Sequence, residues 1–246
     1  MNKSQIIIAA ILSSMLLVGC KHKEEKKSLP DYSETPLTVD TYRELILQAK
    51  QSTLGEGSTI MDNVGISTSL VNSVVYKKSS FFYETALGSE KSVFYNPEDE
   101  KYYDYENHSV FTSSNHYREI DLNTFESKME AGKQRLVDMF NFAFDTTLAV
   151  LNGTSEEFVN PRIKFAKLSG GRKEMIAKAK YMSEEWDPEQ EANVEVEKTK
   201  TLTVYIKNGL LNEFEIDGGQ NDRRYQPSYG NASYSIPAKP QEDTGA

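Results

Sequence analysis

The sequence predicts an α+β fold in which an antiparallel sheet packs against one or two helices. Two segments carry apolar residues at helical spacing, and the segments between and after them alternate with the two-residue period of strands. Aromatic residues make up 11% of the chain, with 14 Tyr against one Trp, a composition that favours half-buried strands. Short polar connections between the strand candidates indicate antiparallel neighbours.

The first residues of the chain have the pattern of an export signal. Lys3 precedes an apolar stretch that runs from Ile6 to Val18 and is interrupted by two serines. A membrane-spanning helix needs about 20 apolar residues, so this shorter stretch predicts a cleaved signal peptide over residues 1–19. Leu17-Val18-Gly19-Cys20 resembles the lipobox of bacterial lipoproteins. The resemblance implies that a diacylglycerol is attached to the thiol of Cys20 and that cleavage makes Cys20 the new N-terminus.

Cys20 is the single cysteine of the chain. No intramolecular disulfide can form, and lipidation accounts for the residue. Two acyl chains on one residue meet the requirement for stable anchoring. An ordinary signal peptide that ends beside a cysteine by chance is the alternative. We therefore expect an extracytoplasmic protein, lipid-anchored either to the outer face of a bacterial cell membrane or to an outer membrane.

The sequence beyond the signal divides into three parts. Residues 20–37 are predicted to form a lipidated, flexible tether, because Lys21 to Lys27 is charge-dense and Pro30 favours extended backbone. Residues 38–236 are long enough to bury a core and are predicted to form a single α+β domain. Residues 237–246 are predicted to be a disordered tail.

The first predicted helix lies at the start of the domain. Thr41 with Glu44 fits a capping box, and the helix should end before Gly55. Its apolar stripe follows the i, i+3, i+4, i+7 spacing of one helix face. The stripe consists of Tyr42, Leu45, Ile46 and Ala49.

The second predicted helix spans residues 123–151. Asn123 is its expected N-cap, an apolar stripe runs from Leu136 to Leu151, and Asn152-Gly153 is its expected end. Gly132 is a point at which the segment could divide into two helices.

The strand candidates lie on either side of the second helix. Before it, strands are expected at 81–85, 92–95, 101–105 and from Val110-Phe111. After it come short candidates at 163–166 and 175–181, and then the clearest hairpin of the chain. Residues 193–206 should pair with 210–216 through Lys207-Asn208-Gly209, because Asn-Gly tolerates the positive φ of a tight turn. A last strand is expected at 234–236.

The charge balance excludes nucleic acid as a partner. Loss of residues 1–19 removes Lys3 from the 28 basic residues and leaves 27 against 37 acidic ones, a net charge of −10. Phosphate contacts need clustered Lys and Arg side chains. The same charge keeps the protein away from an anionic bilayer except through its anchor.

The sequence shows no arrangement of catalytic or metal-binding residues. His108 and His116 lie in a polar stretch without the three or four converging ligands that a metal site needs. Neither a G-x-S-x-G elbow nor a phosphate-binding glycine loop is found. Asp99, Glu100 and Asp104 could hold Ca²⁺ but lack EF-hand spacing, so a solvated turn is the expected structure. The sequence therefore predicts no enzyme, no metal and no cofactor.

The order of the elements resembles a known superfamily. The most similar stretches are Val93 to Asn107 and Leu202 to Ile216. Over residues 38–236 the chain looks like the superfamily of the lipoprotein carrier LolA and the mycobacterial lipoproteins LppX and LprG. The resemblance implies a curved antiparallel sheet, a half-barrel, wrapped around one or two helices, with lipid chains or lipoproteins bound in the gap. A lipoprotein with an unrelated α+β fold is the alternative.

A ligand site of this kind would lie between the sheet and the helices. If the helix stripe underfills the space that the sheet encloses, a long acyl chain can occupy the remainder. The alternative is that the aromatic side chains simply pack the core. The candidate cavity residues are Phe81, Tyr83, Phe94, Phe140 and Phe144.

Two classes of function follow from this layout. The first is a membrane-anchored protein that binds or carries an apolar or lipidic ligand in the cavity. The second is an envelope protein that contacts another protein or a cell-wall glycan through an exposed Tyr-rich face. The sequence does not name the ligand or a protein partner.

Overall fold

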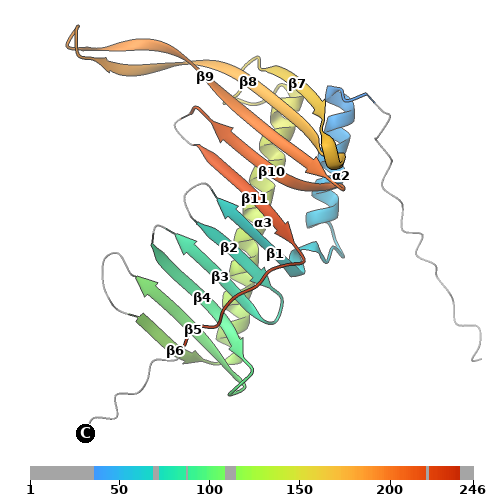
Figure 1. The fold of residues 1–246 in the computed structure, drawn as a ribbon, viewed down its shortest axis with the longest axis vertical. Coiled ribbons are helices and arrows are strands. Elements are labelled where there is room, and N and C mark those ends of the chain that lie inside the picture. The colour runs from blue at the N-terminus through green and yellow to red at the C-terminus, as the bar shows by residue number, and fades with distance from the viewer. Residues whose placement is uncertain (1–35, 69–71, 87, 109–114, 220–221, 239–246) are drawn as a thin grey trace, which may run out of the picture. The chain divides into compact units, whose positions relative to one another are not determined.

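The computed structural model describes residues 36–68, 72–86, 88–108, 115–219 and 222–238, which build an α+β fold (Figure 1). The predicted signal peptide, Cys20 and the tether up to residue 35 lie outside the described residues. The strand expected from Val110-Phe111 and the tail from residue 239 onward lie outside them as well. Within the described ranges, no helix has both the length and the apolar character needed to cross a membrane.

Two α-helices and an open antiparallel sheet form the described part of the chain. The helices are α2 (Val39–Leu54) and α3 (Leu122–Asn152), with short 3-10 helices η1 (Ile60–Asp62) and η2 (Ser169–Gly171). The eleven strands are β1 (Asn63–Thr68), β2 (Ser73–Lys77), β3 (Phe81–Ala86), β4 (Ser89–Asn96), β5 (Lys101–His108), β6 (Asn115–Ile120), β7 (Arg162–Lys167), β8 (Lys173–Asp187), β9 (Ala192–Lys207), β10 (Leu210–Asp217) and β11 (Arg223–Tyr229). Their order is β6-β5-β4-β3-β2-β1-β11-β10-β9-β8-β7, so β6 and β7 are the two edges. The α+β class with a large antiparallel sheet is confirmed.

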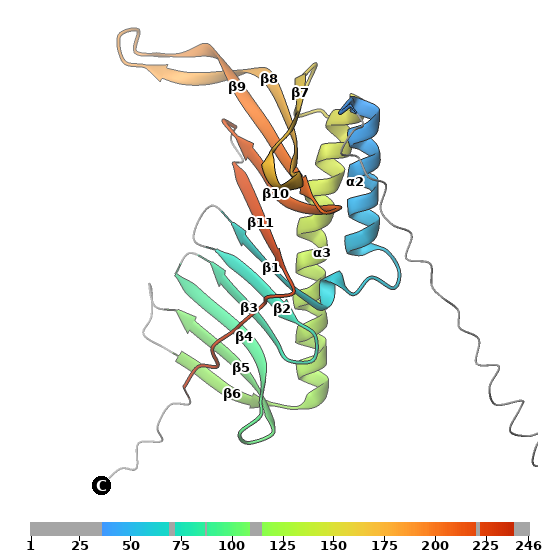
Figure 2. The same cartoon turned by 45° about the vertical axis from the view of Figure 1, so that its right-hand side comes forward.

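Both helices lie on the same face of the sheet, and α3 runs along it past most of the strands (Figure 2). Leu136, Phe140 and Phe144 of α3 are fully buried. Because side chains alternate between the faces of a strand, every second residue of the sheet points toward the helices. Val64 and Ile66 of β1 are examples, since both are buried in the same core as α3. We call this the helix face of the sheet and the opposite side the outer face.

The helix boundaries differ slightly from the predicted ones. Thr38, not Thr41, is the N-cap of α2, and Thr41 completes a capping box with it. Asp121, not Asn123, caps α3, because its Oδ1 accepts a hydrogen bond of 2.7 Å from the N–H of Thr124. The predicted C-terminal ends are confirmed: α2 ends at Leu54, and Gly153 ends α3 with φ 70°.

Gly132 does not divide α3, which is one continuous helix of 31 residues. Instead the glycine lets the helix approach β3 closely. A Cβ at this position would lie 2.3 Å from Cδ2 of Phe82, so the ring would have to move away. A glycine is unusual inside a helix, and its cause here is packing against the sheet.

The predicted position of the hairpin of β9 and β10 is confirmed. Lys207 pairs with Leu210, and Asn208 and Gly209 have φ values of 53° and 72°, as a tight primed turn requires. Val204 and Phe214 are fully buried in the core beneath the helices.

The last strand is not where the sequence placed it. Residues 234–236 form no strand, whereas β11 lies between β1 and β10 and joins the two halves of the sheet. Pro227 obscured this strand, because a proline cannot donate to the ladder. It is tolerated because β10 pairs only with residues 223–225, so Pro227 faces a strand partner on one side alone. Past the residues that pair with β10, the hydroxyl of Tyr229 donates a hydrogen bond of 2.8 Å to the carbonyl of Leu211 in β10.

The close contact at Gly132 gives a first prediction. Alanine favours helix over glycine by about 1 kcal/mol, yet Gly132→Ala should lower the free energy of unfolding, because its Cβ would displace the Phe82 ring. Urea denaturation of Gly132→Ala, Phe82→Leu and the double variant measures this. The loss caused by Gly132→Ala should be smaller in the Phe82→Leu background than in the wild type. Additive effects of the two changes would contradict the contact.

Candidate functional site

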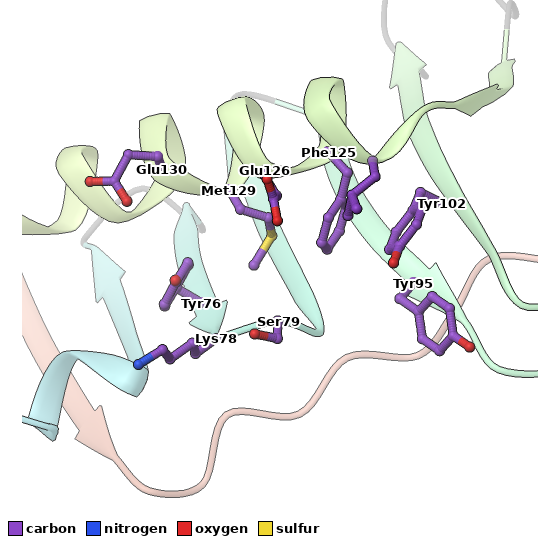
Figure 3. A pocket seen from close by; sticks show the side chains of 10 residues that line it. Tyr76, Lys78, Ser79, Tyr95, Tyr102, Phe125, Glu126, Met129 and Glu130 are labelled. Carbon is purple, nitrogen blue, oxygen red and sulfur yellow. The ribbon is translucent and has the colours of Figure 1, made fainter.

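A groove opens between the first turns of α3 and the helix face of β2, β4 and β5 (Figure 3). Its volume is about 490 Å³. The rim residue Leu122 is 47% exposed, so the groove is accessible from solvent. The lining residues are Tyr76, Lys78, Ser79, Tyr95, Tyr102, Leu122, Phe125, Glu126, Met129 and Glu130.

The helix side of the groove follows from the periodicity of α3. Its five lining residues occur at i, i+3, i+4, i+7 and i+8, which places them on one flank of the helix. Phe125 and Met129 are buried toward the sheet, whereas Glu126 and Glu130 are exposed at the rim. The helix therefore contributes an apolar floor and an acidic edge.

The sheet side of the groove is made of tyrosine rings. Tyr95 and Tyr102 are paired across β4 and β5, and their ring centroids are 5.3 Å apart. The ring of Tyr102 also packs on that of Phe125, with centroids 4.6 Å apart. Tyr76 of β2 is buried beneath the groove. Aromatic rings with accessible hydroxyl groups offer both apolar contact and hydrogen bonds to a ligand.

The charges around the groove are unbalanced toward negative. Lys78 is the basic residue of the lining, and its Nζ already lies 3.5 Å from Oδ2 of Asp62. Among the described residues, no Lys or Arg forms an ion pair with Glu126 or Glu130. Burial, and then the nearby carboxylates of Glu130 and Asp62, raise the pKa of Tyr76. Its hydroxyl is therefore a neutral group at physiological pH.

A smaller cavity of about 240 Å³ lies on the opposite flank of α3 and has a different character. Lys128 of the helix is 3.0 Å from Oδ2 of Asp104, and Arg118 is 3.1 Å from the same oxygen. Arg135 forms an ion pair with Glu84. The charged groups of this cavity form ion pairs with one another between helix and sheet. The cavity therefore offers a ligand fewer unpaired charged groups than the aromatic groove does.

The predicted cavity residues of the strands lie on the outer face of the sheet. Phe81, Tyr83 and Phe94 belong to an aromatic cluster that also contains Tyr103 and is remote from α3. The segment after β11 crosses this cluster (Figure 1), and the ring of Tyr234 lies 5.0 Å from that of Tyr83. The hydroxyl groups of Tyr234 and Ser92 are 2.5 Å apart.

Phe140 and Phe144 belong to α3 and lie on the other side of the sheet, in the core between this helix and the strands. They stack on each other with centroids 6.2 Å apart, and Phe140 also stacks on Tyr229. Both are fully buried. The structure thus separates the five predicted residues into two packed clusters on opposite faces, and none of them lines the groove.

The groove residues were missed because strands place neighbouring residues on opposite faces. Tyr95 and Tyr102 are the direct neighbours of Phe94 and Tyr103, which point outward. The continuation of the helical stripe in the N-terminal direction, through Met129 to Phe125, was the signal available in the sequence. It shows that α3 covers the sheet well before Leu136.

Neither a protein family model nor a curated protein sequence matches this chain. Among the described residues, no group of three or more His, Cys, Asp or Glu side chains is placed to hold a metal ion. The groove itself offers aromatic and apolar contact, the hydroxyl groups of its tyrosines and Ser79, the ammonium group of Lys78 and two carboxylates.

The outer cluster contains a hydrogen bond that can be followed by titration. The hydroxyl of Tyr103 donates to Oδ2 of Asp99 at 2.5 Å, which raises the pKa of Tyr103 to about 12. The folded-state pKa exceeds the ordinary value of 10, so this bond stabilises the fold fully below pH 10 and is lost toward pH 12.

We expect NMR of labelled tyrosine to show Tyr103 titrating near pH 12 and at lower pH in Asp99→Asn. Glu100→Gln, a change of the exposed neighbour, is the matched control and should leave the titration unchanged. A Tyr103 that titrates at the ordinary value in the wild type would contradict the hydrogen bond.

Proposed function

We propose that this chain is an extracytoplasmic bacterial lipoprotein that is anchored through Cys20 and binds an apolar ligand in the groove beside α3. The anchoring half of the proposal is supported by Leu17-Val18-Gly19-Cys20. The binding half is supported by one observation, the solvent-accessible groove of about 490 Å³ with walls of tyrosine, phenylalanine and methionine. Pockets for small ligands are typically roughly 300–1,000 Å³ and mainly apolar, with a few polar groups that fix orientation.

The extent of the ligand site is limited by the packing of α3. From Leu136 onward the helix fills the space against the sheet with fully buried side chains. Toward its N-terminus, the flexible side chain of Met129 leaves room beside Phe125. An acyl chain or another slender apolar group can lie there along the helix, between the helix flank and the Tyr95–Tyr102 pair.

The charge of the rim favours a particular class of ligand. Glu126 and Glu130 border the groove, and the basic side chain of the lining, Lys78, is engaged by Asp62. A ligand with a negative head group would be repelled at this rim, whereas a neutral or cationic group would be accepted. We therefore propose a neutral or cationic amphiphile rather than a fatty acid anion.

We also propose that the sheet is a half-barrel that wraps around the helices. An open antiparallel sheet with two helices on one face is compatible with a half-barrel that wraps the helices, as in the superfamily of LolA, LppX and LprG. In that family the ligand lies between sheet and helix, which is also the position of the groove. We propose a binding role without catalysis, because the lining residues include no recognisable pair of nucleophile and base.

A second candidate function is supported by the outer face. Tyr83 and Tyr117 are half-buried members of the outer aromatic cluster, and no α-helix covers this side of the sheet in the described residues. Tyrosine rings on an open sheet face suit contact with a protein or a glycan. The segment that carries Tyr234 already covers part of the cluster, so the groove is the more accessible site.

Lipidation is tested by Cys20→Ser. Loss of the thiol should abolish incorporation of labelled palmitate and leave the precursor unprocessed or released from the membrane, as measured by gel mobility and fractionation. Ser28→Ala in the tether is a control that should be labelled normally. Continued labelling of Cys20→Ser would contradict the anchoring half of the proposal alone.

Ligand binding is tested at Leu122, with Leu47 as a matched control. Both are half-exposed leucines on helices, at 47% and 50%, but only Leu122 lines the groove. Leu122→Glu should weaken binding of the neutral fluorophore phenylnaphthylamine by about tenfold, or about 1.4 kcal/mol, and Leu47→Glu should leave it unchanged. Dodecyltrimethylammonium should displace the fluorophore at lower concentration than laurate. Equal binding by both variants would contradict the groove as the site.

A further inference from the structure

Beyond the sheet, β8 and β9 continue as a two-stranded arm that projects away from the helices (Figure 1). β7 pairs with β8 only up to Lys178, and β10 pairs with β9 only from Thr201. Residues 179–187 and 192–200 therefore have no other strand beside them in the described structure. An isolated two-stranded ribbon is marginally stable in water, so this arm gains little from its own pairing.

The arm is nevertheless held in a definite geometry at both ends. At its base, the hydroxyl of Tyr181 donates to the carbonyl of Gly218 at 2.6 Å. At its tip, the carboxylate of Asp187 accepts hydrogen bonds from the backbone N–H of Glu189 at 2.8 Å and from Nε2 of Gln190 at 2.9 Å. The tip turn is thus fixed directly beside Trp186.

One face of the arm exposes two large apolar side chains. Trp186, the single tryptophan of the chain, is 62% exposed, and Met182 is 56% exposed. They are four residues apart on β8, so strand alternation places them on the same face. Exposed tryptophan is costly in water and is enriched at the centres of protein interfaces.

The same face also carries two carboxylates that lie directly across from each other on the two strands. Glu184 lies between Met182 and Trp186 and is paired directly with Glu195 of β9. Like charges in a cross-strand pair destabilise a sheet. The described ion pairs of the arm involve other residues, Lys180 with Glu197 and Lys198 with Glu185. From residue 182 to residue 197 the chain holds seven Asp or Glu and no Lys or Arg.

We infer that this arm is a docking element for a protein partner whose contact surface presents Lys or Arg side chains. A cation placed between Glu184 and Glu195 relieves their repulsion and lies on the same face of the arm as Trp186, whose ring can add cation–π attraction. Met182 and Trp186 then bury apolar surface on either side of it. An anionic bilayer is a poor partner for this face, because the carboxylates oppose its charge.

The single tryptophan allows a direct test on the folded chain. Titration with a synthetic peptide of alternating arginine and alanine should change the emission of Trp186, and a peptide of alternating glutamate and alanine should not. Glu184→Gln with Glu195→Gln should weaken binding of the arginine peptide by about tenfold. Glu189→Gln with Glu191→Gln removes the same number of charges from the tip turn and should weaken binding much less.

Three results would overturn the inference. The first is an unchanged emission of Trp186 with the arginine peptide. The second is an equal loss of affinity in the two double variants, which would show unspecific attraction to net charge. The third is a larger shift of Trp186 emission on phosphatidylcholine vesicles than with the arginine peptide, which would make the arm a membrane contact. Trp186→Ala, measured by calorimetry because it contains no tryptophan, should bind the arginine peptide about tenfold more weakly, and its circular dichroism should be unchanged.

Discussion

The packing of α3 along one face of the sheet is the contact on which the other features depend. The helix continues without interruption for 31 residues, so its apolar stripe determines which residues of the strands beneath it are buried in the core. Where the stripe consists of Leu136, Phe140 and Phe144, the interface is filled. Where it consists of Met129 and Phe125, the same interface leaves a groove. A single helix thus provides both a solid core and a site with free volume, according to the size and stiffness of the side chains it presents.

The features that the sequence predicts well are those with local causes. Gly153 ends α3 because a left-handed residue there satisfies the last carbonyl groups, and Asn208-Gly209 closes the hairpin because both residues accept positive φ. β11 has a non-local cause. Its pairing with β1 joins residues more than 150 positions apart, and Pro227 removes the local pattern of a strand. The segment pairs with β1 on one side and with β10 on the other, two strands that are distant from each other in the sequence.

The predicted cavity residues differ from the residues that line the groove, and the alternation of side chains along the strands explains the difference. In β3, β4 and β5, both sets of alternating positions carry aromatic rings, so hydrophobicity does not show which set meets the helix. Phe94 and Tyr103 face outward, and their neighbours Tyr95 and Tyr102 face the groove. A shift of one residue exchanges the two faces completely. Phe82 packs against Gly132 of α3, a contact between segments 50 residues apart that no local pattern reveals.

The groove and the arm share one feature, which is that carboxylates without an ion-pair partner in the described part of the chain lie beside exposed apolar side chains. Elsewhere on the sheet, carboxylates such as Asp104 and Glu213 are matched by arginine or lysine side chains within ion-pair distance. At the rim of the groove and along the face of Trp186, the carboxylates of Glu126, Glu130, Glu184 and Glu195 have no such partner among the described residues. Surface charges contribute little to stability, so unpaired ones beside exposed apolar groups are poorly explained by folding alone. Their attraction for a cation extends only about 10 Å at 0.1 M salt, so each set acts on what is bound directly against it. The groove and the arm thus contribute two local preferences for cationic groups to a protein whose net charge is negative.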